Sequence, residues 1–235
     1  VSQMNGTVVS IGEEFTVLIP FTDKFMPYKE WKVKEDKTGF YTLSPQDIII
    51  IGIVTEDVTP DNVINIKSDY EISLMKIAGN IVYQTHQYLK PYIKPGITTK
   101  ELDKLAYDFI ISKDATPSFL NYNGFPGTIC TSINEEVVHG IPSNRKLKNG
   151  DIIGIDIGAC YHGYHGDSAW SYPVGNVSKE VSYLLEHTEK ALYEGLKQAK
   201  PGNHIGDISN AIECYAKKHN LGIVKELVGH GVGSK

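Results

Sequence analysis

An alternating segment in the middle of the chain constrains the fold most. Between Asp151 and Gly158, Ile153, Ile155 and Ile157 occupy alternate positions, and Asp156 lies between Gly154 and Gly158 on the opposite face. A period of two predicts a β-strand that buries its isoleucine face and directs Asp156 away from it. A second aspartate, Asp167, follows eleven residues later. The residues between the two aspartates fold most simply as a β-hairpin.

The turn of this hairpin determines how close the two carboxylates come. A two-residue loop centred on Tyr161 and His162 pairs Asp156 directly with Asp167, at a Cβ separation of roughly 5 Å. Carboxylates at that distance repel unless one is protonated or a cation lies between them, and hard divalent cations take carboxylate oxygens readily. The hairpin therefore predicts a cation site. Two solvated aspartates on a surface hairpin are the alternative.

Two histidines stand in glycine-containing motifs on either side of the hairpin. His139 lies in Val-His-Gly-Ile-Pro at 138–142, and His230 lies in Gly-His-Gly-Val-Gly at 229–233. Glycine allows the backbone to approach a ligand closely, and imidazole is a common metal ligand. Taken singly, each is more often an ordinary structural histidine; together with the hairpin they form a recognisable pattern.

In this order and at these spacings, the motifs resemble the type I methionine aminopeptidases, which are metallopeptidases of the pita-bread fold. The resemblance runs from about residue 64 to 235. It includes Ser-Asp-Tyr-Glu at 68–71 and Asn-Tyr-Asn-Gly-Phe-Pro at 121–126. The resemblance implies an α+β fold, with helices packed on one face of a curved antiparallel sheet.

The resemblance also implies a metal site. Asp156, Asp167 and His230 are its implied ligands, and they would hold two divalent ions in a dinuclear site. The ions could be cobalt, manganese, iron or zinc, because ligand type does not separate these metals. The family pattern has two further glutamate ligands after His230, which this sequence does not contain.

Four residues match the family's substrate and catalytic positions. The resemblance implies that His139 contacts the nitrogen of the scissile amide and helps its departure. Tyr122, Phe125 and Cys130 match a small apolar pocket for a methionine side chain, since aromatic and thiol groups suit a thioether. Ordinary core packing is the alternative for these three.

The implied activity is removal of the initiator methionine from a peptide or nascent protein N-terminus when the next residue is small. A catalytically silent pita-bread binding module and a proline-specific aminopeptidase of the same fold are the alternatives. A pure binding module needs none of His139, Asp156, Asp167 and His230, so their joint presence favours the enzyme. The pocket residues favour the methionine branch.

An internal repeat bears on the second half of the chain. Lys-Pro-Gly at 94–96 recurs at 200–202, and the helices predicted after each carry apolar residues at matching positions, at an offset of 106. Shared helical periodicity is the alternative explanation. We expect the second repeat to lack its hairpin, and the isolated chain to bind divalent metal weakly with little peptidase activity.

The amino-acid composition bears on the expected partners, the state of the cysteines and the location of the protein. The 235 residues carry a net charge of −5 and contain no basic block, so nucleic acid is not expected to be a partner. The three cysteines are few and widely spaced, so free thiols in a reducing compartment are expected. The longest apolar run is too short to span a bilayer and the N-terminus does not resemble a secretory signal, so a cytoplasmic location without membrane contact is predicted.

Residues 1–62 do not belong to this pattern. Short alternating runs at 7–11, 15–21, 31–34, 40–43 and 48–54 predict a small all-β extension, followed by a polar linker at 55–62. The catalytic domain is then 63–235. Docking to a partner, such as association with the ribosome, is one interpretation of the extension. A stability or linker module without a ligand is the other.

Capping signals and apolar periodicity predict the helices of the catalytic domain. Ser68 with Glu71 and Thr98 with Glu101 form capping boxes before the first two. Two more are predicted over 184–195 and from 202 to 216. His162 and His165, at or beside the hairpin turn, are expected to be solvated. The buried face of the first helix is predicted to consist of Leu74, Ile77, Ala78, Ile81, Val82 and Leu89.

Overall fold

The computed structural model describes residues 6–10, 16–20, 66–225, 227 and 229–234. It divides into two compact units, one of Val1–Ile66 with His187–Gly231 and one of Lys67–Glu186 with Val232–Lys235. In the N-terminal region, β1 (Gly6–Ser10) and β2 (Thr16–Pro20) pair as an antiparallel ribbon, which confirms the first two predicted strands. The strands predicted between 31 and 54, and the linker at 55–62, lie outside the described residues.

An antiparallel sheet forms the centre of the second unit. Its middle strand is β5 (Ile152–Tyr161), which pairs along its whole length with β6 (Tyr164–Pro173). Successive segments of β5 also pair with β4 (Ile129–Ile133) and with the short β3 (Thr116–Pro117). The predicted hairpin is therefore β5–β6, and β4 extends the sheet beside it.

The predicted pairing of the two aspartates is wrong by one residue at the turn. Tyr161 pairs with Tyr164, so the loop consists of His162 and Gly163, which have φ values of +49° and +84°. Positive φ at both central residues is the type I′ geometry that matches strand twist, and glycine adopts it without steric cost. A loop of Tyr161 and His162 would have placed a bulky aromatic residue in this conformation. Asp156 consequently lies opposite Ala169, and Asp167 lies opposite Gly158.

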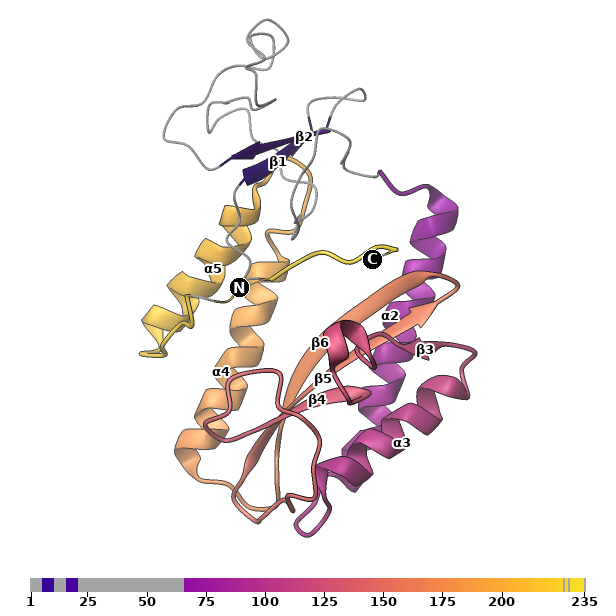
Figure 1. Cartoon of the computed structure of the whole chain (residues 1–235). Helices are drawn as coiled ribbons and strands as arrows, with labels where there is room; N and C mark the ends of the chain where they lie inside the picture. Colours follow the sequence, from indigo (N-terminus) through magenta and orange to yellow (C-terminus); the bar gives the residue numbers. More distant parts are fainter. Residues whose placement is uncertain (1–5, 11–15, 21–65, 226, 228, 235) are drawn as a thin grey trace, which may run out of the picture. The chain divides into compact units, whose positions relative to one another are not determined.

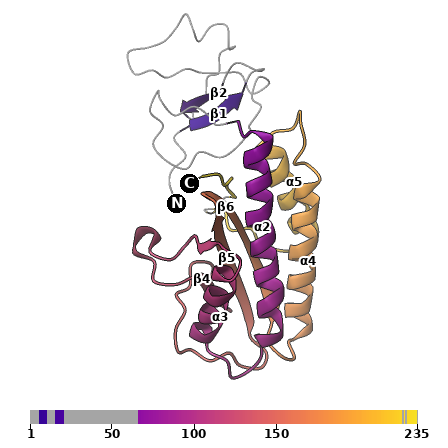
Figure 2. The same ribbon diagram turned by 90° about the vertical axis from the view of Figure 1, so that its right-hand side faces the viewer.

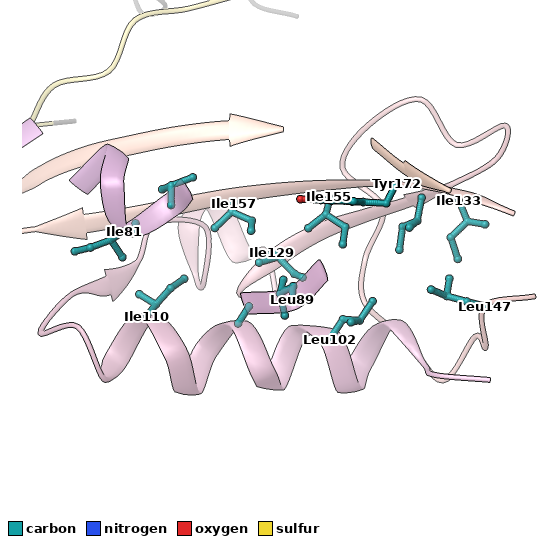
Figure 3. Close-up of a cluster of buried hydrophobic side chains, with 14 of the residues drawn as sticks. Ile81, Leu89, Leu102, Ile110, Ile129, Ile133, Leu147, Ile155, Ile157 and Tyr172 are labelled. Atoms are coloured by element: carbon teal, nitrogen blue, oxygen red, sulfur yellow. The ribbon is translucent and has the colours of Figure 1, made fainter. Parts of the chain in front are cut away.

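Two helices cover one face of the sheet. Helices α2 (Asp69–Leu89) and α3 (Thr99–Ile111) lie against the face that carries the β5 isoleucines (Figures 1 and 2). Ile153, Ile155 and Ile157 are fully buried, as the alternation predicts. Leu102 and Ile110 of α3 point toward the sheet in Figure 3. This apolar layer leaves the opposite face of β5, with Asp156, for a site.

Both predicted capping boxes are present. The Ser68 hydroxyl accepts a hydrogen bond from the Glu71 amide, and the Glu71 carboxylate accepts one from the Ser68 amide. Thr98 and Glu101 make the same reciprocal pair at the start of α3. A capping box depends on residues three apart, so it can be read from sequence without knowledge of the tertiary fold. A short 3₁₀ helix, η3 (Lys90–Tyr92), follows α2.

The buried face of α2 differs from the predicted one in two ways. Ile77 is 40% exposed, so its assignment to the core was wrong. Thr85 and His86 are buried instead, with 0% and 5% exposure. Helix α2 packs against β6, and Ser168 and Tyr172 of that strand supply hydrogen-bond partners for His86. A polar residue at a buried helical position was therefore missed because apolar periodicity ignores it.

The first unit contains most of α4 (Lys179–Leu196) and all of α5 (Ile205–Lys218). These helices meet at Gly195, where an added Cβ would overlap the side chain of Ile212. Helix α5 begins 106 residues after α3, the offset of the sequence repeat. The glycines of the two Lys-Pro-Gly turns, Gly96 and Gly202, have φ values of +98° and +88°. The two turns therefore share backbone geometry as well as sequence.

Candidate metal centre

Three predicted site residues share the face of the sheet that points away from α2 and α3. Cys130 of β4 lies opposite Asp156, and Asp167 of β6 lies opposite Gly158, two residues along β5 from Asp156. Residues opposite one another in an antiparallel ladder project to the same side, as do alternate residues of one strand. Asp156 and Asp167 are therefore diagonal neighbours, with Cα atoms roughly 7–8 Å apart. This spacing leaves more room between the carboxylates than the direct pairing predicted from sequence.

Asp156 shows that this face suits a cation. Its Oδ1 atom is buried and has no hydrogen-bond partner. A buried carboxylate oxygen without a donor is costly, and a cation satisfies it as well as a hydrogen bond would. Carboxylate oxygens are also the ligands that hard divalent ions prefer. The residues present therefore fit the metal that the sequence motifs imply.

The pKa of the Cys130 thiol is affected by the negative charges on the same face. Burial, together with the nearby charges of Asp156, Asp167 and Asp103, raises the pKa of Cys130 to about 12. A thiol with that pKa is neutral at physiological pH. The Cys130 side chain is therefore a neutral, polarisable group next to the two aspartates.

Close backbone packing shapes the site around Gly158, which lies between the two aspartates in the ladder. A Cβ at Gly158 would overlap the ring of Phe119 and the side chain of Ser118, so only glycine fits beneath this segment. Ser118 Oγ lies 2.8 Å from His165 Nδ1 and shares a hydrogen bond with it. His165, predicted to be solvated rather than a ligand, is half-buried, and burial lowers its pKa. His162, in the turn, is exposed as predicted.

His139 is exposed and has a φ of +58°. The next residue, Gly140, is bonded to β4 on both sides: its carbonyl accepts from the Thr131 amide at 2.8 Å, and its amide donates to Ser132 Oγ at 3.2 Å. These bonds hold the 134–142 loop against β4 next to Cys130. His139 is thus attached to the strand that borders the aspartates.

The three residues predicted to form a methionine pocket differ in environment. Cys130 is buried, Phe125 is half-buried, and Tyr122 is 60% exposed in the short 3₁₀ helix η4 (Tyr122–Gly124). The Phe125 amide donates to the Tyr122 carbonyl at 2.9 Å, which joins the two aromatic residues in one turn. A cavity of about 340 Å³ begins at the adjacent Pro126 and Gly127, and none of the three predicted residues lines it. Their role in binding methionine stays a prediction.

His230 belongs to the other compact unit. It is exposed, and its Nδ1 lies 3.0 Å from the carbonyl oxygen of Gly231. A carbonyl oxygen can only accept, so Nδ1 carries the proton and the lone pair of the neutral ring is on Nε2. Metal-binding histidines commonly donate one N–H to a carbonyl in this way. Within the described residues no group of three or more His, Cys, Asp and Glu side chains could hold a metal ion, so the full ligand set stays a prediction.

Two other predictions can be compared with the structure. Cys130, Cys160 and Cys214 are free thiols, as their number and spacing predicted. Within the described part of the chain, every helix is too short or too polar to cross a membrane.

Comparison with known proteins places these features in a family. The model of metallopeptidase family M24 matches residues 73–235, and a model described only as a family of unknown function matches residues 1–85. Methionine aminopeptidase 1 of Bacillus subtilis is 58% identical over 167 residues, which are 71% of this chain and 67% of that protein. The methionine aminopeptidase of Clostridium acetobutylicum is 47% identical, over 72% of this chain and 68% of that protein.

A solved structure shows the same similarity to methionine aminopeptidases. The crystal structure of methionine aminopeptidase from Rickettsia prowazekii aligns with a TM-score of 0.71 at 40% identity, covering 73% of this chain and 69% of that one. The chain thus spans about two thirds of the length of these relatives. It belongs to metallopeptidase family M24, and its relatives there are methionine aminopeptidases of the pita-bread fold.

Proposed function

We propose that this protein removes the N-terminal methionine of proteins by metal-dependent hydrolysis of the first peptide bond. The observation that carries the proposal is the buried, unpartnered Oδ1 of Asp156 beside Asp167, on the face of the sheet opposite the isoleucines that pack against α2 and α3. The M24 match and the methionine aminopeptidases 47–58% identical to this chain support the reaction and its substrate class.

Each site residue has a proposed task. Asp156 and Asp167 would hold two divalent ions, with His230 as a further ligand. When bound, such ions supply Lewis acidity for amide hydrolysis. His139 contacts the scissile amide nitrogen and delivers a proton to the departing amine. Tyr122, Phe125 and the neutral thiol of Cys130 surround the methionine side chain.

The extension and the location are also proposals. We propose that residues 1–62 form a small β module separate from the catalytic domain at 63–235. The pairing of β1 with β2 supports a β structure at the start of this segment. We further propose that the protein acts in the cytoplasm, where nascent protein N-termini are available.

Methionine release from a Met-Ala-Ser peptide tests the proposed reaction. The chain is incubated with saturating Mn²⁺, and free methionine is quantified over time. His139→Ala is expected to slow release by about 10²–10⁴-fold, the usual contribution of a positioned proton donor. His162→Ala is the matched control, since His162 is exposed in the turn and has no proposed role.

Three results would contradict the proposal. Release that continues unchanged after chelation of the metal would exclude metal-dependent hydrolysis. Faster cleavage of Xaa-Pro peptides than of Met-Ala-Ser would place the specificity in the proline branch. Equal activity of the His139→Ala and His162→Ala variants would remove His139 from the mechanism.

A further inference from the structure

His86 is a buried imidazole in the apolar face of α2. It is 5% exposed and lies between Val82 and Leu89, which are 1% and 0% exposed. An imidazole in such a position is costly unless both ring nitrogens have partners. Burial lowers the pKa of His86, while its bond to Ser168 and the charge of Asp156 oppose that shift. The ring is therefore neutral at physiological pH, and each nitrogen has one fixed hydrogen-bonding role.

Both partners of His86 lie on β6. Nε2 lies 3.0 Å from the carbonyl oxygen of Ser168, and Nδ1 lies 3.0 Å from the hydroxyl of Tyr172. Because the carbonyl can only accept, Nε2 carries the proton, and Nδ1 accepts the hydrogen of the Tyr172 hydroxyl. Tyr172 lies over the isoleucines of β5 (Figure 3). The imidazole thus joins α2 to two points of one strand.

Among the described strands, β6 pairs only with β5, so its remaining fixed points come from other elements. The Ser168 carbonyl belongs to the residue that directly follows Asp167. On the other side of Asp167, Gly166 packs against the backbone of Ala78 and Gly79 in α2, with no space for a Cβ. Asp167 therefore lies between two points at which α2 fixes β6, one a backbone contact and the other the hydrogen bond from His86.

We propose that His86 is a positioning residue that holds β6 so that Asp167 can share a divalent cation with Asp156. The inference rests on the proposed function, because it takes the two aspartates as ligands. His86 lies on the α2 side of the sheet, opposite the face that carries the two aspartates. It acts through the Ser168 carbonyl on the backbone that carries Asp167. Groups that orient metal ligands in this way typically change metal affinity by 10–100-fold when removed.

The test compares three variants of the full chain by calorimetric titration with Mn²⁺ and by thermal unfolding. His86→Leu fills the space but removes both hydrogen bonds, and it is expected to weaken Mn²⁺ binding by about tenfold or more. His86→Gln retains an amide N–H that can reach the Ser168 carbonyl, and it is expected to stay within about threefold of the original affinity. Val82→Ala is the matched control, since it removes buried volume from the same helix face and leaves the two hydrogen bonds of His86 to β6 in place.

A second measurement follows the strand in the absence of metal. His86→Leu is expected to speed amide hydrogen exchange in residues 166–169, whereas Val82→Ala leaves exchange there unchanged. Loss of Mn²⁺ affinity in Val82→Ala equal to that in His86→Leu would reduce the role of His86 to general stability and overturn the inference. Unchanged Mn²⁺ affinity in His86→Leu would overturn it as well.

Failure of the proposed function gives a different result. If Asp156→Asn and Asp167→Asn bind Mn²⁺ as tightly as the original chain, or if the original chain binds none, the aspartates are not ligands and both proposals fail. If the asparagine variants lose affinity and His86→Leu does not, only the positioning role of His86 fails.

Discussion

The orientation of Asp156 could be predicted from the sequence, but the environment of its carboxylate could not. The alternation of Ile153, Ile155 and Ile157 predicted the orientation of its side chain, because strand periodicity is a local property. The buried, unpartnered Oδ1 could not be predicted, since it depends on which loops cover that face of the sheet. His86 was missed for a related reason. Its position four residues after Val82 and three before Leu89 marks the buried helix face, but hydropathy alone assigns histidine to the surface.

The environment of Cys130 predicts its reactivity. With a pKa of about 12, the thiol stays protonated, and it is also buried, so alkylation in the native state should be very slow. Cys214 is exposed and Cys160 is half-buried, so they provide internal controls. We expect iodoacetamide at pH 8 to label Cys214 first, Cys160 more slowly, and Cys130 only after denaturation. Peptide mass spectrometry measures the order, and early labelling of Cys130 would contradict this description of the site.

At the level of elements, α2 and β6 approach one another through a pair of glycines. The backbone of Gly166 lies against Gly79, and this contact sets the height of the hairpin over the helix. The hairpin tip is attached to the same helix, because the Tyr164 hydroxyl donates to the Glu71 carboxylate at 2.6 Å. That bond and the capping bonds from Ser68 lower the pKa of Glu71 to about 2. Helix α2 therefore supports the aspartate hairpin from its tip to Tyr172.

The two glycines should respond in opposite ways to substitution by alanine. A Cβ at Gly166 would overlap the backbone of Ala78 and Gly79, so Gly166→Ala should destabilise the protein by about 1–3 kcal/mol. A Cβ at Gly79 meets nothing within 4 Å, so Gly79→Ala should stabilise it by about 0.5–1 kcal/mol through its effect on helix propensity. Denaturant unfolding measures both. Equal effects of the two substitutions would show that the helix and the hairpin are not in close contact.

Elements were easier to predict than their pairing. The starts of α2 and α3 follow from capping boxes, which are local, and the structure confirms both. The register of β5 with β6 depended on choosing between adjacent two-residue loops. Gly163 contained the deciding information, because a type I′ turn needs positive φ at both central residues and glycine provides it at the second. The wrong loop placed the two aspartates directly opposite one another, whereas in the structure they are diagonal neighbours.

At the scale of the whole molecule, the second unit provides the aspartate face and the first contains the second Lys-Pro-Gly turn with α5. The equal offset of α3 and α5 and the similar φ values of Gly96 and Gly202 agree with the duplication inferred from sequence. The relation of His230 to the aspartates could not be predicted from local patterns, because it depends on the placement of a segment far along the chain. The chain spans about two thirds of the length of its methionine aminopeptidase relatives.

A crystal of the protein grown with Mn²⁺ and measured for anomalous scattering tests the central claim most directly. The account predicts an anomalous peak at the aspartate face, about 2.0–2.4 Å from Asp156 Oδ1 and bound also by Asp167. The same crystal form of Asp156→Asn should lose the peak or show it much weakened. A manganese-free face in which Asp156 Oδ1 is hydrogen-bonded to water or to the protein, with Asp167 turned to solvent, would contradict the account.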